Sequence, residues 1–138
     1  NLAEVGSAWM AECDELKQPD FAGLKNLTKV HDKWMFECAT LSTPTFRGLV
    51  KLAEVGNEWM AQCNDLKNPS FDGLAQLTRV GFEWMSHCPE LEKPHFIHLE
   101  KLTRVGFEWM MHSLALHESV EFTESLAREW LEQCDSRI

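Results

Sequence analysis

Four Met-x-x-Cys pairs are the residues of this chain whose types and spacing could most directly do chemistry. They are Met10/Cys13, Met35/Cys38, Met60/Cys63 and Met85/Cys88. Thioether and thiolate sulfurs are soft ligands that suit Cu(I), and residues three apart lie on one face of a helix. Cysteine is also a small residue that is often buried, and methionine fills gaps in cores. Packing is therefore the stronger interpretation of these pairs, and Cu(I) binding remains an alternative.

A second possible site lies where histidines gather in the later part of the chain. His87, Cys88, His95 and His98 carry the nitrogen and sulfur ligands that zinc accepts. Their spacing matches no standard zinc module, so we interpret these histidines as surface residues and predict no metal site. The chain also lacks a Gly-rich phosphate loop and the G-x-S-x-G and H-E-x-x-H motifs. We therefore predict no catalytic residues, no cofactor and no enzymatic activity.

The feature that must position all these residues is a tandem repeat of 25 residues. Leu, Val and Trp-Met each recur at this interval, with the consensus P-x-F-x-G-L-x-x-L-x-x-V-G-x-x-W-M-x-x-C-x-x-L. Five units start near residues 2, 27, 52, 77 and 102, and a shortened closing helix is expected at about 120–136. Terminal repeats are commonly atypical caps. We predict one repeat domain over 1–138, which enters in the middle of a unit and so resembles a piece of a longer array.

Each unit is predicted to form one amphipathic helix. On a helical wheel, the apolar residues between Leu24 and Leu41 occupy less than half of the circle, while Phe21 lies outside this arc. The alternation of period two that half-buried strands show is absent. The predicted fold is therefore all-α: an antiparallel helical array, either a bundle or a short α-solenoid. The alternative is two short helices per repeat.

The expected core of this array is a spine of tryptophans. Its members are Trp9, Trp34, Trp59, Trp84, Trp109 and Trp130. Glycines such as Gly56 and Gly81 also fall on the apolar face, where glycine costs about 1 kcal/mol against alanine. We predict that the Trp of a neighbouring helix packs against them. His31 takes this glycine position in the second unit, so its contact should be looser or polar.

Composition excludes several classes of function. The 138 residues include 22 acidic against 13 basic side chains, for a net charge of −9, which argues against general nucleic-acid binding. No apolar run approaches the roughly 20 residues of a membrane span. No secretory signal is visible, and an odd count of five cysteines, four of them at a spacing of 25 residues, fits a reducing cytoplasm better than a disulfide framework.

The leading functional prediction is a non-enzymatic helical-repeat scaffold or adaptor that binds another protein, because repeat arrays present extended surfaces. The candidate contact residues are Phe36, Phe82 and Phe107, which lie outside the common apolar positions. The alternative is an amphipathic coat on a lipid or other hydrophobic surface. In general layout the chain resembles the exchangeable apolipoproteins, although it shares no motif with them.

Overall fold

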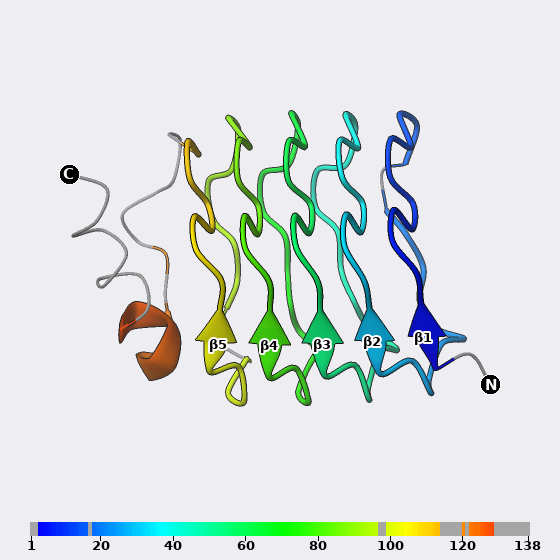
Figure 1. Cartoon of the computed structure of the whole chain (residues 1–138). Helices are drawn as coiled ribbons and strands as arrows, with labels where there is room; N and C mark the ends of the chain where they lie inside the picture. The colour runs from blue at the N-terminus through cyan, green and yellow to red at the C-terminus, as the bar shows by residue number, and fades with distance from the viewer. Residues whose placement is uncertain (1–2, 17, 97–98, 114–119, 121, 129–138) are drawn as a thin grey trace.

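The computed structural model shows a solenoid of stacked coils, one coil for each 25-residue unit (Figure 1). It describes residues 3–16, 18–96, 99–113, 120 and 122–128. One parallel sheet runs through the stack in the order β1-β2-β3-β4-β5. Its strands are β1 (Glu4–Val5), β2 (Lys29–Val30), β3 (Glu54–Val55), β4 (Arg79–Val80) and β5 (Arg104–Val105). Paired residues are equivalent positions of consecutive units, such as Val30 and Val55.

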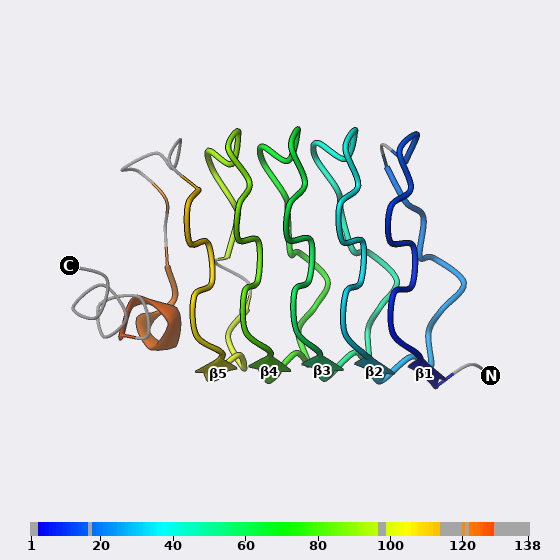
Figure 2. The same cartoon turned by 45° about the horizontal axis from the view of Figure 1, so that its top comes forward.

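The predictions of an all-α fold and of an antiparallel helical-repeat array are wrong. Within the described residues, the only helical segment is a short one over 124–128. In the part of the repeat units that the structure describes, neither one long helix nor two short helices form. Figure 2 shows the strands side by side along one edge of the stack, while the rest of each coil rises away from them. The apolar side chains that were assigned to a helix face point into the interior of this solenoid.

A spacing of three residues explains both the fold and the error. Phe21, Leu24, Leu27 and Val30 are spaced by three, and Leu24 and Leu27 each donate a backbone hydrogen bond to the carbonyl three residues earlier, at 3.0 and 3.3 Å. Successive turns therefore direct every third side chain inward. On a helical wheel such a series drifts by about 60° per step. Leu24, Leu27 and Val30 drift in this way, and Phe21 falls outside the arc for the same reason.

The segment after each strand has an unusual backbone. In every coil, three alternate residues have positive φ; in the third coil these are Glu58 (60°), Met60 (55°) and Gln62 (58°). Non-glycine residues rarely adopt this region, since it brings Cβ close to the following carbonyl oxygen. Backbone bonds between coils compensate: Glu58 N–H donates to Phe82 O at 2.8 Å, and Met60 N–H donates to Trp34 O at 2.9 Å. The neighbouring coils on both sides thus hold this segment in place.

Two aromatic stacks form the centre of the core. Trp59 stacks on Trp34 with ring centroids 5.0 Å apart and on Trp84 at 5.3 Å, in nearly parallel planes. A parallel stack of phenylalanines runs beside it, with Phe46 and Phe71 5.5 Å apart. Each Trp also meets the Phe rings edge-on, as Trp59 and Phe71 do at 69°. Both offset stacking and edge contacts are favourable for aromatic rings, so the stacks fix the register of the coils.

The C-terminal end of the stack is covered by residues of the closing segment. Phe122 continues the phenylalanine stack with its ring 5.5 Å from Phe96, and Leu126 is fully buried. Thr123 caps the N-terminus of the helical segment 124–128, because its hydroxyl accepts a hydrogen bond from Leu126 N–H at 3.3 Å. Trp130 and the rest of the helix expected at about 120–136 lie outside the described residues. Within the described part of the chain, no helix has the length and apolar character to cross a membrane.

Candidate functional site

The cysteines of the Met-x-x-Cys pairs form a ladder of hydrogen bonds to the backbone. Cys38 Sγ donates to Met10 O at 3.0 Å, Cys63 Sγ to Met35 O at 3.1 Å and Cys88 Sγ to Met60 O at 3.2 Å. Ser113 continues the series, with Oγ 2.9 Å from Met85 O. Because a thiol must keep its proton to donate, this arrangement supports packing of the coils. It does not present thiolates to a soft metal.

Burial raises the pKa of these thiols. Removal from water raises the pKa of Cys38 to about 11 and that of Cys88 to about 12, and it raises the pKa of Cys63 as well. At pH 8 we therefore expect iodoacetamide to alkylate the half-buried Cys13 while Cys38, Cys63 and Cys88 stay unmodified until urea is added. Mass spectrometry of tryptic peptides resolves the individual cysteines. Rapid native-state alkylation of Cys63 would contradict the ladder.

The later histidines do not assemble a metal centre in the described structure. His87 and His112 are equivalent residues of adjacent coils, and their rings stack with centroids 4.7 Å apart. Cys88 is buried and donates inward, so it points away from a surface site. Among the described residues, no group of three or more His, Cys, Asp or Glu side chains could hold a metal ion. His98 lies outside these residues.

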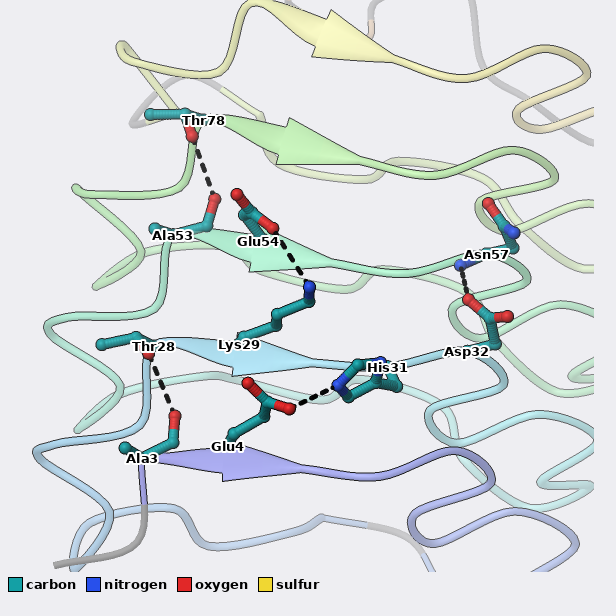
Figure 3. A network of polar contacts seen from close by, with 10 residues as sticks. All are labelled: Ala3, Glu4, Thr28, Lys29, His31, Asp32, Ala53, Glu54, Asn57 and Thr78. Atoms are coloured by element: carbon teal, nitrogen blue, oxygen red, sulfur yellow. Dashed lines mark hydrogen bonds and ion pairs between the residues drawn. The ribbon is translucent and has the colours of Figure 1, made fainter.

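The outer face of the sheet carries a network of polar contacts in its first three coils (Figure 3). Lys29 Nζ lies 3.7 Å from the Glu54 carboxylate, and His31 Nε2 lies 2.7 Å from that of Glu4. The hydrogen bond with His31, helped by nearby positive charge, lowers the pKa of Glu4. Charges on this part of the face are thus matched to one another.

A groove lies beside these side chains, above the glycine column of the coils. Its volume is about 240 Å³. The residues that line it come from three successive coils: Lys29, Val30, His31, Asp32, Glu54, Val55, Gly56, Asn57, Arg79 and Gly81. The glycines pack closely against the preceding coil, since a Cβ on Gly81 would lie 2.8 Å from both Asn57 N and Gly56 C.

The predicted packing of tryptophan on glycine is therefore wrong. The neighbours of Gly56 and Gly81 are the backbone and the Asp32 or Asn57 side chain of the preceding coil, while the indoles stack on one another. The looser or polar contact with a tryptophan that was expected at His31 does not form either, and His31 is instead hydrogen-bonded to the Glu4 carboxylate. His31 directly follows the buried Val30, and its ring lies among the charged side chains of the outer face (Figure 3).

The residue after each glycine position occupies what we call the corner column. Its members are Ser7, Asp32, Asn57, Phe82 and Phe107. Asp32 Oδ1 accepts from Asn57 N–H, and Asn57 Oδ1 accepts from Phe82 N–H, both at 2.9 Å. In this part of the column the side chain joins its coil to the next one. Phe82 has no acceptor to offer Phe107, so this structural role ends in the fourth coil.

Phe82 and Phe107 are exposed side chains on adjacent coils. Their exposed fractions are 44% and 79%, and Val50, at 52%, is the other large apolar side chain that is exposed in the described part. Phe36 belongs to a different column, which Ala61 occupies in the next coil, and the ammonium group of Lys33 lies over its ring at 5.1 Å. The three predicted contact residues thus divide into one pair and one separate residue.

Sequence reasoning missed the two arginines that share the face with Phe82 and Phe107. Arg79 and Arg104 are paired neighbours on β4 and β5, and both are exposed. Within the described residues, neither forms an ion pair, in contrast to Lys29. The sequence did mark these two coils as alike, because residues 78–85 and 103–110 are identical and read TRVGFEWM. We call Arg79, Phe82, Arg104 and Phe107 the Arg–Phe patch.

Comparisons with known proteins add no assignment. No protein-family model, no curated protein and no solved structure matches the chain. Function must therefore be argued from the described surface itself.

Proposed function

We propose that this solenoid is a non-enzymatic scaffold that binds another protein through the Arg–Phe patch. The observation that carries the proposal is the change of role along the corner column. Asp32 and Asn57 use their side chains to bond the next coil, whereas Phe82 and Phe107 direct large apolar rings to solvent. Burial of a fully exposed phenylalanine side chain contributes about 1.5–3 kcal/mol, so Phe107, which is 79% exposed, would contribute more than Phe82, which is 44% exposed.

The structural needs of the fold do not explain these phenylalanines. An intramolecular hydrogen bond contributes about 1 kcal/mol or less when it is exposed, as the bond of Asn57 is, and the phenylalanine at position 82 gives this up. Exposed aromatic residues and arginine are the side chains most enriched at protein interfaces. A residue that departs from a local structural rule without a compensating contact is a candidate for function.

The alternative of a coat on a lipid or other hydrophobic surface depended on amphipathic helices, which the described part of the repeat units does not form. That mode requires an amphipathic helix whose apolar face is free to meet the hydrophobic phase. Here the apolar side chains of the repeat are already buried against adjacent coils, as Trp59 and Leu66 are. A protein partner is the occupant that needs only the few apolar side chains exposed at the corner.

We place the scaffold in a reducing compartment, with the cytoplasm as our proposal. Cys38, Cys63 and Cys88 are free thiols that act as hydrogen-bond donors inside the core. A disulfide or an oxidised sulfur could not make these bonds, and reduced cysteines persist where glutathione and thioredoxin act.

The decisive variant is the double substitution Phe82→Asn and Phe107→Asn. Asparagine is the natural residue at the equivalent position 57, where it bonds the next coil, so we expect the melting temperature to be unchanged or slightly raised. A photo-crosslinking amino acid at the exposed position 103, beside the patch, should capture a discrete protein in cells of the source organism, and the double variant should abolish this adduct.

The matched control is Val50→Lys. It removes the other exposed apolar side chain and introduces the residue found at position 25, the equivalent position one repeat earlier. It should leave the adduct unchanged. An adduct that persists at the wild-type level in a folded Phe82→Asn, Phe107→Asn variant would refute this function for the patch.

A further inference from the structure

Along the outer column of the sheet, ion pairs form in the first three coils, whereas within the described residues neither arginine of the last two coils forms one, although Arg79 is paired in register with Glu54. This column reads Glu4, Lys29, Glu54, Arg79 and Arg104. Glu54 is engaged by Lys29 at 3.7 Å, while Arg79 and Arg104 are in register on neighbouring strands. Adjacent strands lie about 4.8 Å apart, and like charges directly opposite one another are destabilising. The pair of guanidinium groups therefore favours an anionic group from outside.

The glycine column separates these arginines from the phenylalanines in both coils. Each coil presents the same row, Arg79-Val80-Gly81-Phe82 or Arg104-Val105-Gly106-Phe107, in which the valine points inward. Because glycine adds no side chain, the surface is low between the arginine and the phenylalanine, and the groove over coils two to four includes Arg79 and Gly81. The two rows lie side by side, so that equivalent residues of the two coils are neighbours along the solenoid axis.

We propose that the Arg–Phe patch binds an acidic peptide segment that carries apolar side chains, lying along the solenoid axis over Gly81 and Gly106. This inference rests on the function proposed above and names the chemistry of the partner. Carboxylates accept paired hydrogen bonds from guanidinium groups, and apolar side chains of the same segment pack against Phe82 and Phe107. Charge complementarity decides the occupant, since the arginines are exposed and have no ion pair within the described residues.

A long polyanion fits this surface less well than a short acidic peptide. Glu83 and Glu108 directly follow the two phenylalanines, and the chain as a whole has a net charge of −9. Nucleic acids and anionic membranes bind through broad basic surfaces whose charges neutralise many phosphates. Here the positive charge of the patch is confined to two arginines. A long polyanion would be repelled by the surrounding acidic side chains. A short segment whose few acidic groups meet the arginines, and whose apolar side chains contact the phenylalanines, gains binding energy that outweighs this repulsion.

The test uses the full chain and fluorescein-labelled peptides of twelve residues in fluorescence anisotropy titrations. The first peptide alternates Glu with Leu or Phe, the second has Lys in place of every Glu, and the third has Ser in place of every apolar residue. We expect the first to bind at least tenfold more tightly than either of the others. Its affinity should fall when NaCl rises from 50 to 500 mM, because exposed ion pairs are screened by salt.

Charge-reversal variants assign the binding to the patch. Arg79→Glu with Arg104→Glu should weaken the acidic peptide at least tenfold, and Arg79→Lys with Arg104→Lys should weaken it less, since lysine keeps the charge but lacks the planar fork. Lys25→Glu with Lys51→Glu is the matched control, which removes the same number of positive charges elsewhere on the surface. Equal weakening by the control, or equal binding of the lysine peptide, would overturn the inference.

The outcomes separate this inference from the function on which it rests. If the crosslinked adduct depends on Phe82 and Phe107 but is unaffected by the Arg79→Glu, Arg104→Glu variant, the protein scaffold stands and the acidic partner is refuted. If neither pair of substitutions affects the adduct, the proposed function itself fails. Tighter, arginine-dependent binding of a thymidine 12-mer or of phosphatidylserine vesicles would also refute the peptide as the ligand.

Discussion

Replacement of Trp59 by alanine is expected to lower the free energy of unfolding by roughly 4 kcal/mol, as measured by urea denaturation followed by circular dichroism. Trp59 is fully buried and has stacked indoles on both sides, Trp34 at 5.0 Å and Trp84 at 5.3 Å. Its removal leaves a cavity that the neighbouring coils cannot close, because their backbone bonds fix the spacing of the stack. The loss would be a large fraction of the 5–15 kcal/mol that stabilises a typical domain.

Two variants show whether this effect arises from the position in the stack. Trp9 is half-buried and stacks on Trp34 at 5.5 Å, so Trp9→Ala should cost only about 2 kcal/mol. Within the described residues, the indole N–H of Trp59 has no hydrogen-bond partner. Trp59→Phe should therefore cost less than Trp59→Ala, because it keeps a ring and removes an unpaired donor. Equal costs for alanine at positions 9 and 59 would contradict the stacked architecture.

The repeat identified the interior residues, although it led to the wrong secondary structure. Residues at fixed positions of the 25-residue unit, such as Leu27, Val30, Trp34 and Cys38, are buried. A set of inward residues spaced by three and four is compatible with a helix and with a chain of turns. The distinguishing sign was the position of Phe21 outside the helical arc, since a strict spacing of three from Phe21 through Val30 gives turns.

The left-handed segments could not have been foreseen from local propensity. Glu58, Met60 and Gln62 all have positive φ, but glutamate, methionine and glutamine are good helix formers and have no preference for this region. Their conformation depends on backbone bonds to coils 25 residues away in both directions, as between Glu58 N–H and Phe82 O. Such non-local bonds do not appear in a pattern of apolar and polar residues.

The candidate site was partly predictable because columns of the solenoid correspond to positions of the repeat. Phe82 and Phe107 stood out as apolar residues where other units have polar ones. Arg79 and Arg104 were missed because, on a helical wheel, they fall among the other charged residues of the polar side, where no residue stands out. Once the strands pair in register, equivalent residues of consecutive units become neighbours, and two arginines in succession become a physical feature.

The second large effect is expected at Gly81. Alanine at this position should lower the free energy of unfolding by about 3 kcal/mol, because the added Cβ would press on the backbone of the preceding coil. It would lie 2.8 Å from Asn57 N and 2.8 Å from Gly56 C, and backbone atoms cannot rotate away as a flexible side chain can. Relief would require the fourth coil to move outward, which would stretch the bond from Gly81 N–H to Val55 O, now 3.0 Å.

Gly6→Ala is the matched control, because nothing lies within 4 Å of the Cβ that it would add. Its cost should be near zero, or it should stabilise the protein slightly by restricting the unfolded chain. His31 shows that a side chain is accommodated at this position in the second coil. Gly81 lies between coils that are held from both directions. Equal stability of the Gly6→Ala and Gly81→Ala variants would mean that the coils separate freely, and the close stacking of backbone on backbone would then not be what requires glycine in this column.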